Sequence, residues 1–188
     1  MPDRLYLSIW TRNPSPLTIH ERLATLLRTF PFSRLQPNLE LTVHGVSMSE
    51  PVLLEQSFQG SDQWEDLFGA LEAWRSPDAA LEVEGAWDLL QPEGSEWKLT
   101  PSRVNVLAFG PEFERGDNDD DLRIEFGLES LFLPETESPH SFKMVEGNIR
   151  SLLKLVADVE AALPVQKRLL WSESGGNFAE RLAELAGR

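Results

Sequence analysis

The sequence predicts an α+β protein with a mainly antiparallel sheet and helices packed against it. Three observations support this fold class. Several short segments alternate apolar and polar residues, which is the pattern of strands with one buried face. Other segments carry apolar residues at every third or fourth position, as amphipathic helices do. Short turns rich in Pro, Gly, Asn and Ser join these segments, with no low-complexity linker between them.

The first ninety residues are predicted to contain six elements, in the order strand, helix, strand, strand, helix, strand. In the first strand, residues 4–10, Leu and Ile alternate with Tyr, Ser and Trp. The first helix covers residues 18–30, because Thr18 and Glu21 have the spacing of a capping box and Pro31 ends the helical pattern. This order is that of a ferredoxin-like split βαβ fold. The remaining four elements are predicted at residues 39–46, 52–58, 61–74 and 79–90.

Residues 91–133 are predicted to extend the sheet as a β-meander. The turn "QPEG" at residues 91–94 leads into strands at residues 95–99 and 103–109. The segment 121–133 has the strongest strand signal of the chain, because apolar residues occupy every second position over four repeats. The apolar face of this segment consists of Leu122, Ile124, Phe126 and Leu128.

Residues 142–188 are predicted to form C-terminal helices. A long amphipathic helix covers residues 142–164 and ends at a proline. Asn177, with Glu180 three positions later, has the spacing of a cap for a last helix. No break in composition separates these helices from the rest of the chain, so we expect a single domain over residues 1–188.

Acidic residues dominate the charge of the chain. Among 188 residues there are 17 Lys and Arg against 31 Asp and Glu, which gives a formal net charge of −14 at neutral pH. Such a field repels phosphate backbones and anionic membrane surfaces, and it attracts basic proteins and cations. We therefore expect neither a nucleic acid nor a membrane as a partner, and we expect a basic protein as the favoured one.

The composition also excludes several kinds of site. The chain has no cysteine, so disulfide scaffolds, zinc–thiolate sites and cysteine nucleophiles are excluded. No stretch approaches the ~18 consecutive apolar residues of a membrane-spanning helix. Residues 1–16 lack the basic region and long apolar run of a secretory signal. The expected location is the cytoplasm.

An acidic cluster, "GDNDDD", precedes the strong strand signal. Asp117, Asp119 and Asp121 match the first ligand positions of an EF-hand calcium loop. The match then fails, because the positions that require Gly and a bidentate Glu are Leu122 and Leu128. We interpret the cluster as a solvated hairpin loop, and a loose cation site or an acidic docking patch remain open alternatives. The candidate patch consists of Glu112, Glu114, Asp117, Asp119, Asp120 and Asp121.

A second candidate site lies on predicted strands. The alternation places Tyr6 and Trp10 opposite the apolar face of the first strand, and Thr42 and His44 opposite that of residues 39–46. If the helices bury the apolar faces, these four side chains share the other face of the sheet and offer a ligand pocket or a partner surface. The alternative is that the helix at 142–164 covers them.

Catalytic and metal-binding motifs are not recognisable. The three histidines, His20, His44 and His140, have no zinc-site spacing. Glu82 and Glu84 share a strand face, which by itself is weak support for a carboxylate pair of the glycosidase type. There is no GxSxG elbow, and "SESGGN" lacks the spacing and lysine of a phosphate-binding loop. We assign no catalytic residue, no metal and no cofactor.

Two kinds of function remain compatible with these observations. The favoured hypothesis is a non-catalytic, acidic interaction protein, of the immunity or antitoxin kind, that binds a basic protein. The alternative is a small-molecule-binding or enzymatic domain that uses an open sheet face with Tyr6, Trp10 and His44. A third hypothesis makes the same aromatic face a dimer interface.

Overall fold

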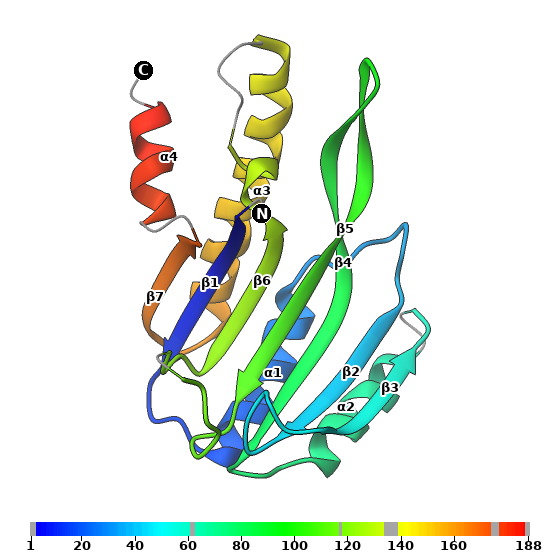
Figure 1. The fold of residues 1–188 in the computed structure, drawn as a ribbon, viewed down its shortest axis with the longest axis vertical. Helices are drawn as coiled ribbons and strands as arrows, with labels where there is room; N and C mark the ends of the chain where they lie inside the picture. Colours follow the sequence, from blue (N-terminus) through cyan, green and yellow to red (C-terminus); the bar gives the residue numbers. More distant parts are fainter. Residues whose placement is uncertain (1–2, 61–62, 117, 134–138, 174–176, 187–188) are drawn as a thin grey trace.

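The computed structural model describes residues 3–60, 63–116, 118–133, 139–173 and 177–186 (Figure 1). These residues form an α+β structure with a seven-stranded antiparallel sheet, as the sequence predicts. In chain order the elements are β1 (Arg4–Thr11), α1 (Pro16–Thr29), β2 (Leu39–Gly45), β3 (Val52–Phe58), α2 (Trp64–Ala73), β4 (Ala79–Glu93), β5 (Glu96–Phe109), β6 (Leu122–Leu128), a 3-10 turn (Glu129–Leu131), α3 (Pro139–Ala162), β7 (Val165–Ser172) and α4 (Phe178–Ala186).

The strands follow the spatial order β3-β2-β4-β5-β6-β1-β7. The strand and helix order expected for the first ninety residues is present along the chain, but the ferredoxin-like arrangement is not confirmed. In that arrangement β1 would pair with the strands of the first ninety residues, whereas here it lies between β6 and β7. The apolar residue Leu7 of β1 faces Ile124 on one side and Leu170 on the other. Pairing partners distant in sequence therefore decide the position of β1.

The hydrophobic core lies between the sheet and one layer of helices. Figure 1 shows α1, α2 and α3 on the far side of the sheet. Each described α-helix contributes to one cluster of buried side chains together with the apolar faces of the strands. Among the described residues, no helix covers the opposite face of the sheet. The helix predicted at 142–164, observed as α3, therefore packs on the same face as α1. The core contacts include Leu5 and Leu7 of β1, Leu23 and Leu26 of α1, Leu67 of α2, Leu152 and Leu155 of α3, and Phe178 of α4.

The start of α1 differs from the expected capping box. Ser15 is the N-cap, and its hydroxyl accepts a hydrogen bond from the Thr18 backbone N–H, while the Thr18 hydroxyl accepts one from the Ser15 N–H. Pro16 occupies the first turn, where its missing N–H costs nothing. The helix thus begins before Thr18, and Glu21 has no capping role. Serine followed by proline is the signal that locates this cap.

Three strands differ from the sequence prediction. The strand predicted at residues 121–133 ends at Leu128 as β6 and is followed by the 3-10 turn at Glu129–Leu131. The segments 95–99 and 103–109 form a single strand, β5, because its register with β4 is unbroken from Glu93↔Glu96 to Ala80↔Phe109. The resulting long hairpin projects beyond the rest of the sheet (Figure 1). The region expected to be only helical contains the edge strand β7, whose side chains Lys167 and Arg168 are exposed. An exposed edge strand lacks clean alternation, so the sequence pattern did not reveal it.

Candidate functional site: the uncovered face of the sheet

The face of the sheet opposite the helices carries polar and charged side chains in its centre. Residues that pair directly across antiparallel strands project their side chains to the same face. The registers align one row across five strands, from β1 through β6, β5 and β4 to β2. This row consists of Tyr6, Glu125, Asn105, Glu84 and Glu40. We refer to this side of the sheet as the uncovered face.

The four residues that the sequence proposed as one ligand site all lie on the uncovered face, but in two separate places. Tyr6 and Trp10 belong to β1, and Thr42 and His44 belong to β2. Strands β4, β5 and β6 lie between β1 and β2. Four steps of about 4.8 Å between neighbouring strands place the two pairs roughly 19 Å apart. The structure therefore does not bring these four side chains into one pocket.

Tyr6 is packed against Trp171 of β7 rather than free to meet a ligand. The two rings stack with their centroids 4.4 Å apart. The Tyr6 hydroxyl donates to the Glu173 carboxylate at 2.7 Å, and the Trp171 indole N–H donates to Ser8 Oγ at 3.0 Å. Burial raises the pKa of Tyr6, and the hydrogen bond to Glu173 acts in the same direction. Tyr6 thus remains a neutral donor that ties β1 to the end of β7.

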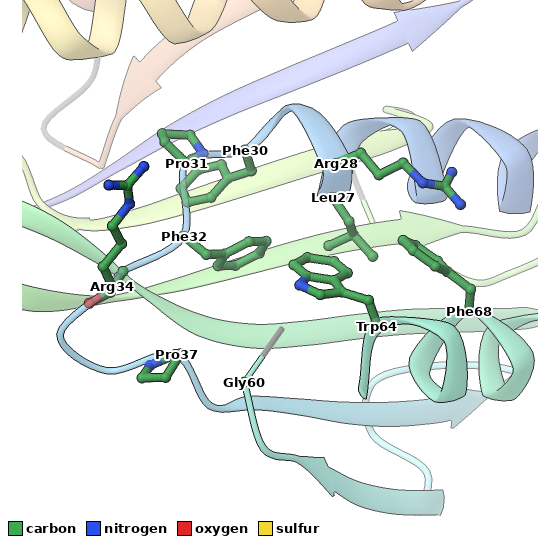
Figure 2. A pocket seen from close by; sticks show the side chains of 11 residues that line it. Leu27, Arg28, Phe30, Pro31, Phe32, Arg34, Pro37, Gly60, Trp64 and Phe68 are labelled. Atoms are coloured by element: carbon green, nitrogen blue, oxygen red, sulfur yellow. The ribbon is translucent and has the colours of Figure 1, made fainter. Parts of the chain in front are cut away.

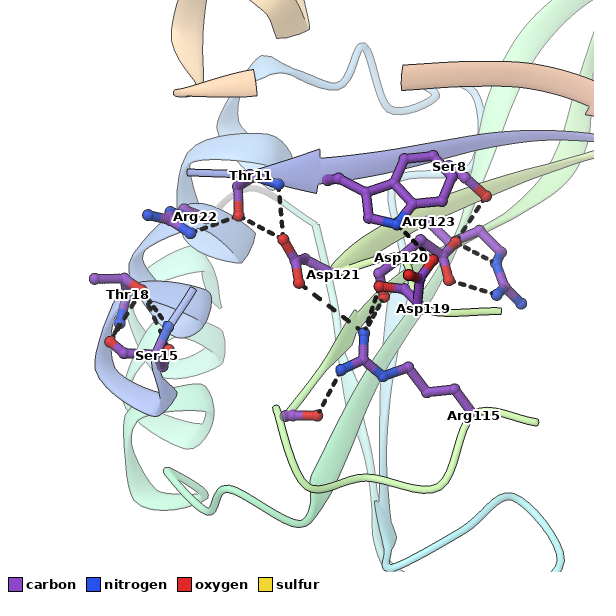
Figure 3. Close-up of polar contacts among 12 residues, drawn as sticks. Ser8, Thr11, Ser15, Thr18, Arg22, Arg115, Asp119, Asp120, Asp121 and Arg123 are labelled. Carbon is purple, nitrogen blue, oxygen red and sulfur yellow. Dashed lines mark hydrogen bonds and ion pairs between the residues drawn. The ribbon is translucent and has the colours of Figure 1, made fainter. Parts of the chain in front are cut away.

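Two carboxylates of the acidic cluster, those of Asp120 and Asp121, point inward instead of lying in a solvated loop (Figure 3). Asp120 is fully buried, and its carboxylate accepts hydrogen bonds from Ser8 Oγ at 2.7 Å and from Arg123 Nε and Nη2 at 2.8 and 2.7 Å. Asp121 is also buried and accepts from the Thr11 backbone N–H at 2.7 Å and from the Thr11 hydroxyl at 2.8 Å. The prediction of a solvated hairpin loop is therefore wrong for these two residues. Their buried carboxylates hold the loop against the end of β1.

Two arginines anchor the cluster from other directions. The Arg22 guanidinium of α1 donates to Thr11 Oγ1 at 2.5 Å, which leaves the Thr11 hydroxyl hydrogen for Asp121. Arg115 donates to the backbone carbonyls of Asp119 and Asp120 at 3.1 and 2.5 Å. Asn and Asp are common in loops, so the composition alone suggested a solvated turn. The sequence signal of an interior role was the presence of Arg115 and Arg123 on either side of the acids, since buried carboxylates need such partners.

The other acidic residues of the predicted patch have different positions. Asp119 is exposed and accepts a hydrogen bond from the Trp10 indole N–H at 2.7 Å. Glu112 and Glu114 are exposed, and Asp117 lies outside the described residues. The six candidate acids therefore do not form one surface patch.

A different group of carboxylates gathers on the uncovered face over β3, β2 and β4. We call Glu40, Glu55, Glu82 and Glu84 the acidic strip. Glu40 pairs directly with Glu84, and Thr42 is flanked by Glu82 on one side and Glu55 on the other. Like charges opposite one another destabilise a sheet. Within the described part of the chain, no cation lies within ion-pair distance of Glu40 or Glu55.

The two remaining carboxylates of the acidic strip have partners in different directions. Glu84 forms an ion pair with Arg103, and Glu82 Oε2 lies 3.0 Å from His44 Nε2. His44 Nδ1 is buried and has no hydrogen-bond partner among the residues described. Because the carboxylates of Glu82 and Glu84 are engaged separately, the geometry gives no support to a glycosidase-like pair.

Four exposed apolar side chains lie at the end of the β2–β3 hairpin. Val46, Met48, Val52 and Leu53 are 43–54% exposed, and we call them the apolar tip. Val46 has a φ of 62°, which is strained for a β-branched residue. Its N–H donates to the Asp78 carbonyl at 2.7 Å, and its carbonyl accepts from the Glu114 N–H at 2.8 Å. The backbone is thus held in a strained conformation that presents an apolar side chain to solvent.

A polar depression of about 250 Å³ lies near the centre of the uncovered face. Burial raises the pKa of Glu125 in its wall, and Glu82 raises it further, against the attraction of Arg123. Asn105 Oδ1 is buried there and finds no hydrogen-bond partner among the described residues. The lining residues are Arg4, Arg103, Asn105, Glu125, Gly127 and Leu128.

In the part of the chain that the structure describes, no group of three or more His, Asp or Glu side chains is placed to hold a metal ion. None of the helices found there is long and apolar enough to cross a membrane. Comparison of the chain with protein-family models, with curated proteins and with solved structures finds no significant match in any of the three. The functional argument therefore rests on the chemistry of the surface itself.

Proposed function

We propose that this protein is a non-catalytic interaction protein that binds a basic protein partner through the acidic strip and the apolar tip. The observation that carries the proposal is the direct pairing of Glu40 with Glu84 beside Glu55 and Glu82. Like charges directly opposite one another destabilise a sheet. The exposed residues Glu40 and Glu55 form no ion pair within the described part of the chain, whereas the half-buried Glu82 and Glu84 contact His44 and Arg103. A basic partner would relieve that repulsion. An immunity or antitoxin protein that neutralises a basic toxin domain is a concrete form of this function.

The apolar tip supports the same proposal. Protein interfaces combine an apolar centre with a polar rim, and complementary charge raises the rate of association. Val52 pairs with His44, whose imidazole lies 3.0 Å from the Glu82 carboxylate, so an exposed apolar side chain adjoins the acidic strip at this end of β3. A partner with basic side chains around an apolar patch would fit this combination. Association should weaken as salt increases.

The decisive experiment is site-specific photo-crosslinking in the producing cells. A photoreactive side chain at Thr42, between Glu55 and Glu82, should capture a basic protein. The double variant Glu40→Gln/Glu55→Gln should weaken binding of the captured protein by at least about tenfold, since each lost charge-assisted contact contributes about 1.5 kcal/mol or more.

The matched control variant is Glu21→Gln/Glu65→Gln, which removes the same charge from α1 and α2 on the helical side. It should bind the partner as the unaltered protein does. Equal weakening by both double variants would attribute binding to net charge alone and contradict a specific acidic strip. Capture of a second copy of this chain as the sole product would instead support the dimer hypothesis.

A further inference from the structure

A separate groove lies on the helical side of the molecule, away from the acidic strip (Figure 2). It has a volume of about 890 Å³ and runs between the end of α1, the segment after it and the start of α2. Ligand-binding cavities for small molecules commonly have volumes of about 300–1,000 Å³. The groove is therefore of a size that fits a small organic molecule.

Aromatic rings form a continuous row along this groove. The Phe30 and Phe32 ring centroids are 4.7 Å apart, those of Phe32 and Trp64 are 5.9 Å apart, and those of Trp64 and Phe68 are 5.5 Å apart. Phe32, Trp64 and Phe68 are only partly buried, so part of each ring faces the groove. Neighbouring rings are inclined to one another by 30–54°, and the exposed face of a single ring in the row can stack on a planar molecule.

The position of Phe32 in this row depends on a glycine in β4. A Cβ atom added at Gly85 would lie 2.8 Å from the Phe32 ring and 2.6 Å from Leu39. The absence of a side chain at Gly85 thus lets the Phe32 ring lie against the sheet. This close packing beneath the groove holds the Phe32 ring in place as one wall of the groove.

Two arginines border the groove, Arg28 and Arg34. The guanidinium carbon of Arg28 is 3.9 Å from the centroid of the Phe68 ring. Within the described residues, neither Arg28 nor Arg34 forms an ion pair, although acids outnumber bases 31 to 17 in the chain. Carboxylates pair with Arg75, Arg103, Arg115, Arg123, Arg150, Arg168 and Arg181, whereas Arg4, Arg12 and Arg22, like Arg28 and Arg34, form no ion pair among the described residues.

We propose that this groove binds a small organic anion with a flat aromatic body, such as an aryl carboxylate or sulfonate. The aromatic row binds the flat body, and a guanidinium group at one end of the row binds the anionic group through charge-assisted hydrogen bonds, either that of Arg28 beside Phe68 or that of Arg34 at the opposite end. The net charge of −14 repels anions elsewhere on the surface, which makes two unpaired arginines beside apolar rings a selective site. This binding activity is independent of the partner surface proposed above.

The test compares two fluorescent probes of similar shape, the anionic anilinonaphthalene sulfonate and the neutral phenylnaphthylamine. The unaltered protein should bind the anionic probe at a single saturable site. Arg28→Gln/Arg34→Gln should weaken that binding at least tenfold and change binding of the neutral probe less than twofold. Trp64→Leu should weaken binding of both probes, and Phe32→Leu serves the same purpose if the Trp64 variant does not fold.

The matched control is Arg103→Gln/Arg150→Gln, which removes the same charge from exposed positions outside the groove. This variant should bind both probes as the unaltered protein does. Nuclear magnetic resonance spectroscopy locates the bound probe. The anionic probe should shift the indole N–H signal of Trp64, which lines the groove. Equal weakening in the two double variants, or saturation without a shift of the Trp64 signal, would overturn the proposal.

Discussion

At Asp120, a fully buried carboxylate is matched by three hydrogen-bond donors, one from Ser8 and two from Arg123. Burial of a charge is tolerated only when such partners compensate for lost hydration. Asp119, its neighbour in the chain, is exposed and accepts one hydrogen bond from Trp10. Two adjacent residues of one type thus have different roles, because they point to different environments.

Replacement of Asp120 should therefore be costly. We expect Asp120→Ala to lower the free energy of unfolding by about 3–5 kcal/mol, because it leaves the Arg123 guanidinium without its buried partner. Asp119→Ala should cost less than about 1 kcal/mol, as for an exposed hydrogen bond. Urea denaturation of the two variants measures both values. Similar losses in the two variants would contradict the interior role of Asp120.

Glu125 should give the protein a measurable pH dependence. Burial raises the pKa of Glu125 above its ordinary value of 4.5, so between pH 4.5 and the folded-state pKa this carboxyl binds more protons in the folded state than in the unfolded state. Its contribution to stability therefore falls as pH rises from 4.5 through the folded-state pKa. Glu125→Gln should be more stable than the unaltered protein at neutral pH, and the difference should shrink toward about pH 4.

Thermal unfolding midpoints measured across this pH range test the prediction for Glu125. Asn105 and Arg123 both lower the pKa of Glu125. A Gln variant that is less stable at neutral pH would mean that these attractions outweigh the cost of burial.

Among the elements, β2 carries residues that stabilise the sheet on one face and residues that the proposed function needs, at a cost in stability, on the other. Its apolar residues Leu41 and Val43 are fully buried under the helices. On the opposite face Glu40 meets Glu84 of β4 directly. One face of the strand stabilises the sheet. The other carries a like-charge pair, which the ion pair of Glu84 with Arg103 offsets in part and a basic partner would relieve further.

We expect Glu40→Gln to raise the free energy of unfolding by about 0.2–1 kcal/mol, because it removes a like-charge cross-strand pair. The same variant should bind the basic partner more weakly. Chemical denaturation and a titration with the captured partner measure the two effects. Glu84→Gln is the comparison, since it also removes the ion pair with Arg103 and should stabilise less. A loss of stability in Glu40→Gln would remove the basis of the functional argument.

At the scale of the whole molecule, β1 connects the edge strand β7 to the rest of the sheet. β1 lies between β6 and β7, and Tyr6 pairs with Trp171 across most of the chain length. Leu5, Leu7 and Ile9 are fully buried. The sheet is therefore incomplete until β1 and β7 are both in place, and the contacts between these strands are non-local.

Hydrogen exchange can test this arrangement. We expect the backbone amides of β1 to exchange as slowly as those of β5, through global unfolding, although β1 is near the N-terminus. The edge strand β3 should exchange faster, because most of its side chains are exposed and only one of its edges is paired within the sheet. Exchange in β1 as fast as in β3 would show that the N-terminal strand opens independently.

The apolar periodicity was sufficient to predict the class of structure and most of its elements. It located β1, β2, β3, β4, α1 and α2 to within a few residues, since buried faces require regular apolar spacing. It also located the start of β6 but extended this strand through the residues of the 3-10 turn. It missed β7, because an exposed edge strand needs no such spacing. It also divided β5 at a point where only the unbroken register with β4 defines a single strand.

The amino-acid sequence by itself determined the α+β class, the acidic net charge and the face of β1 and β2 on which Tyr6, Trp10, Thr42 and His44 lie, because alternation and composition are local properties. Only the tertiary structure decided which strands are neighbours. That order separates the two pairs by three strands, buries Asp120 and Asp121, and brings Glu40 beside Glu84. The physical reason is that pairing between distant strands depends on the fit of whole apolar faces and on buried charge partners, which no local pattern encodes.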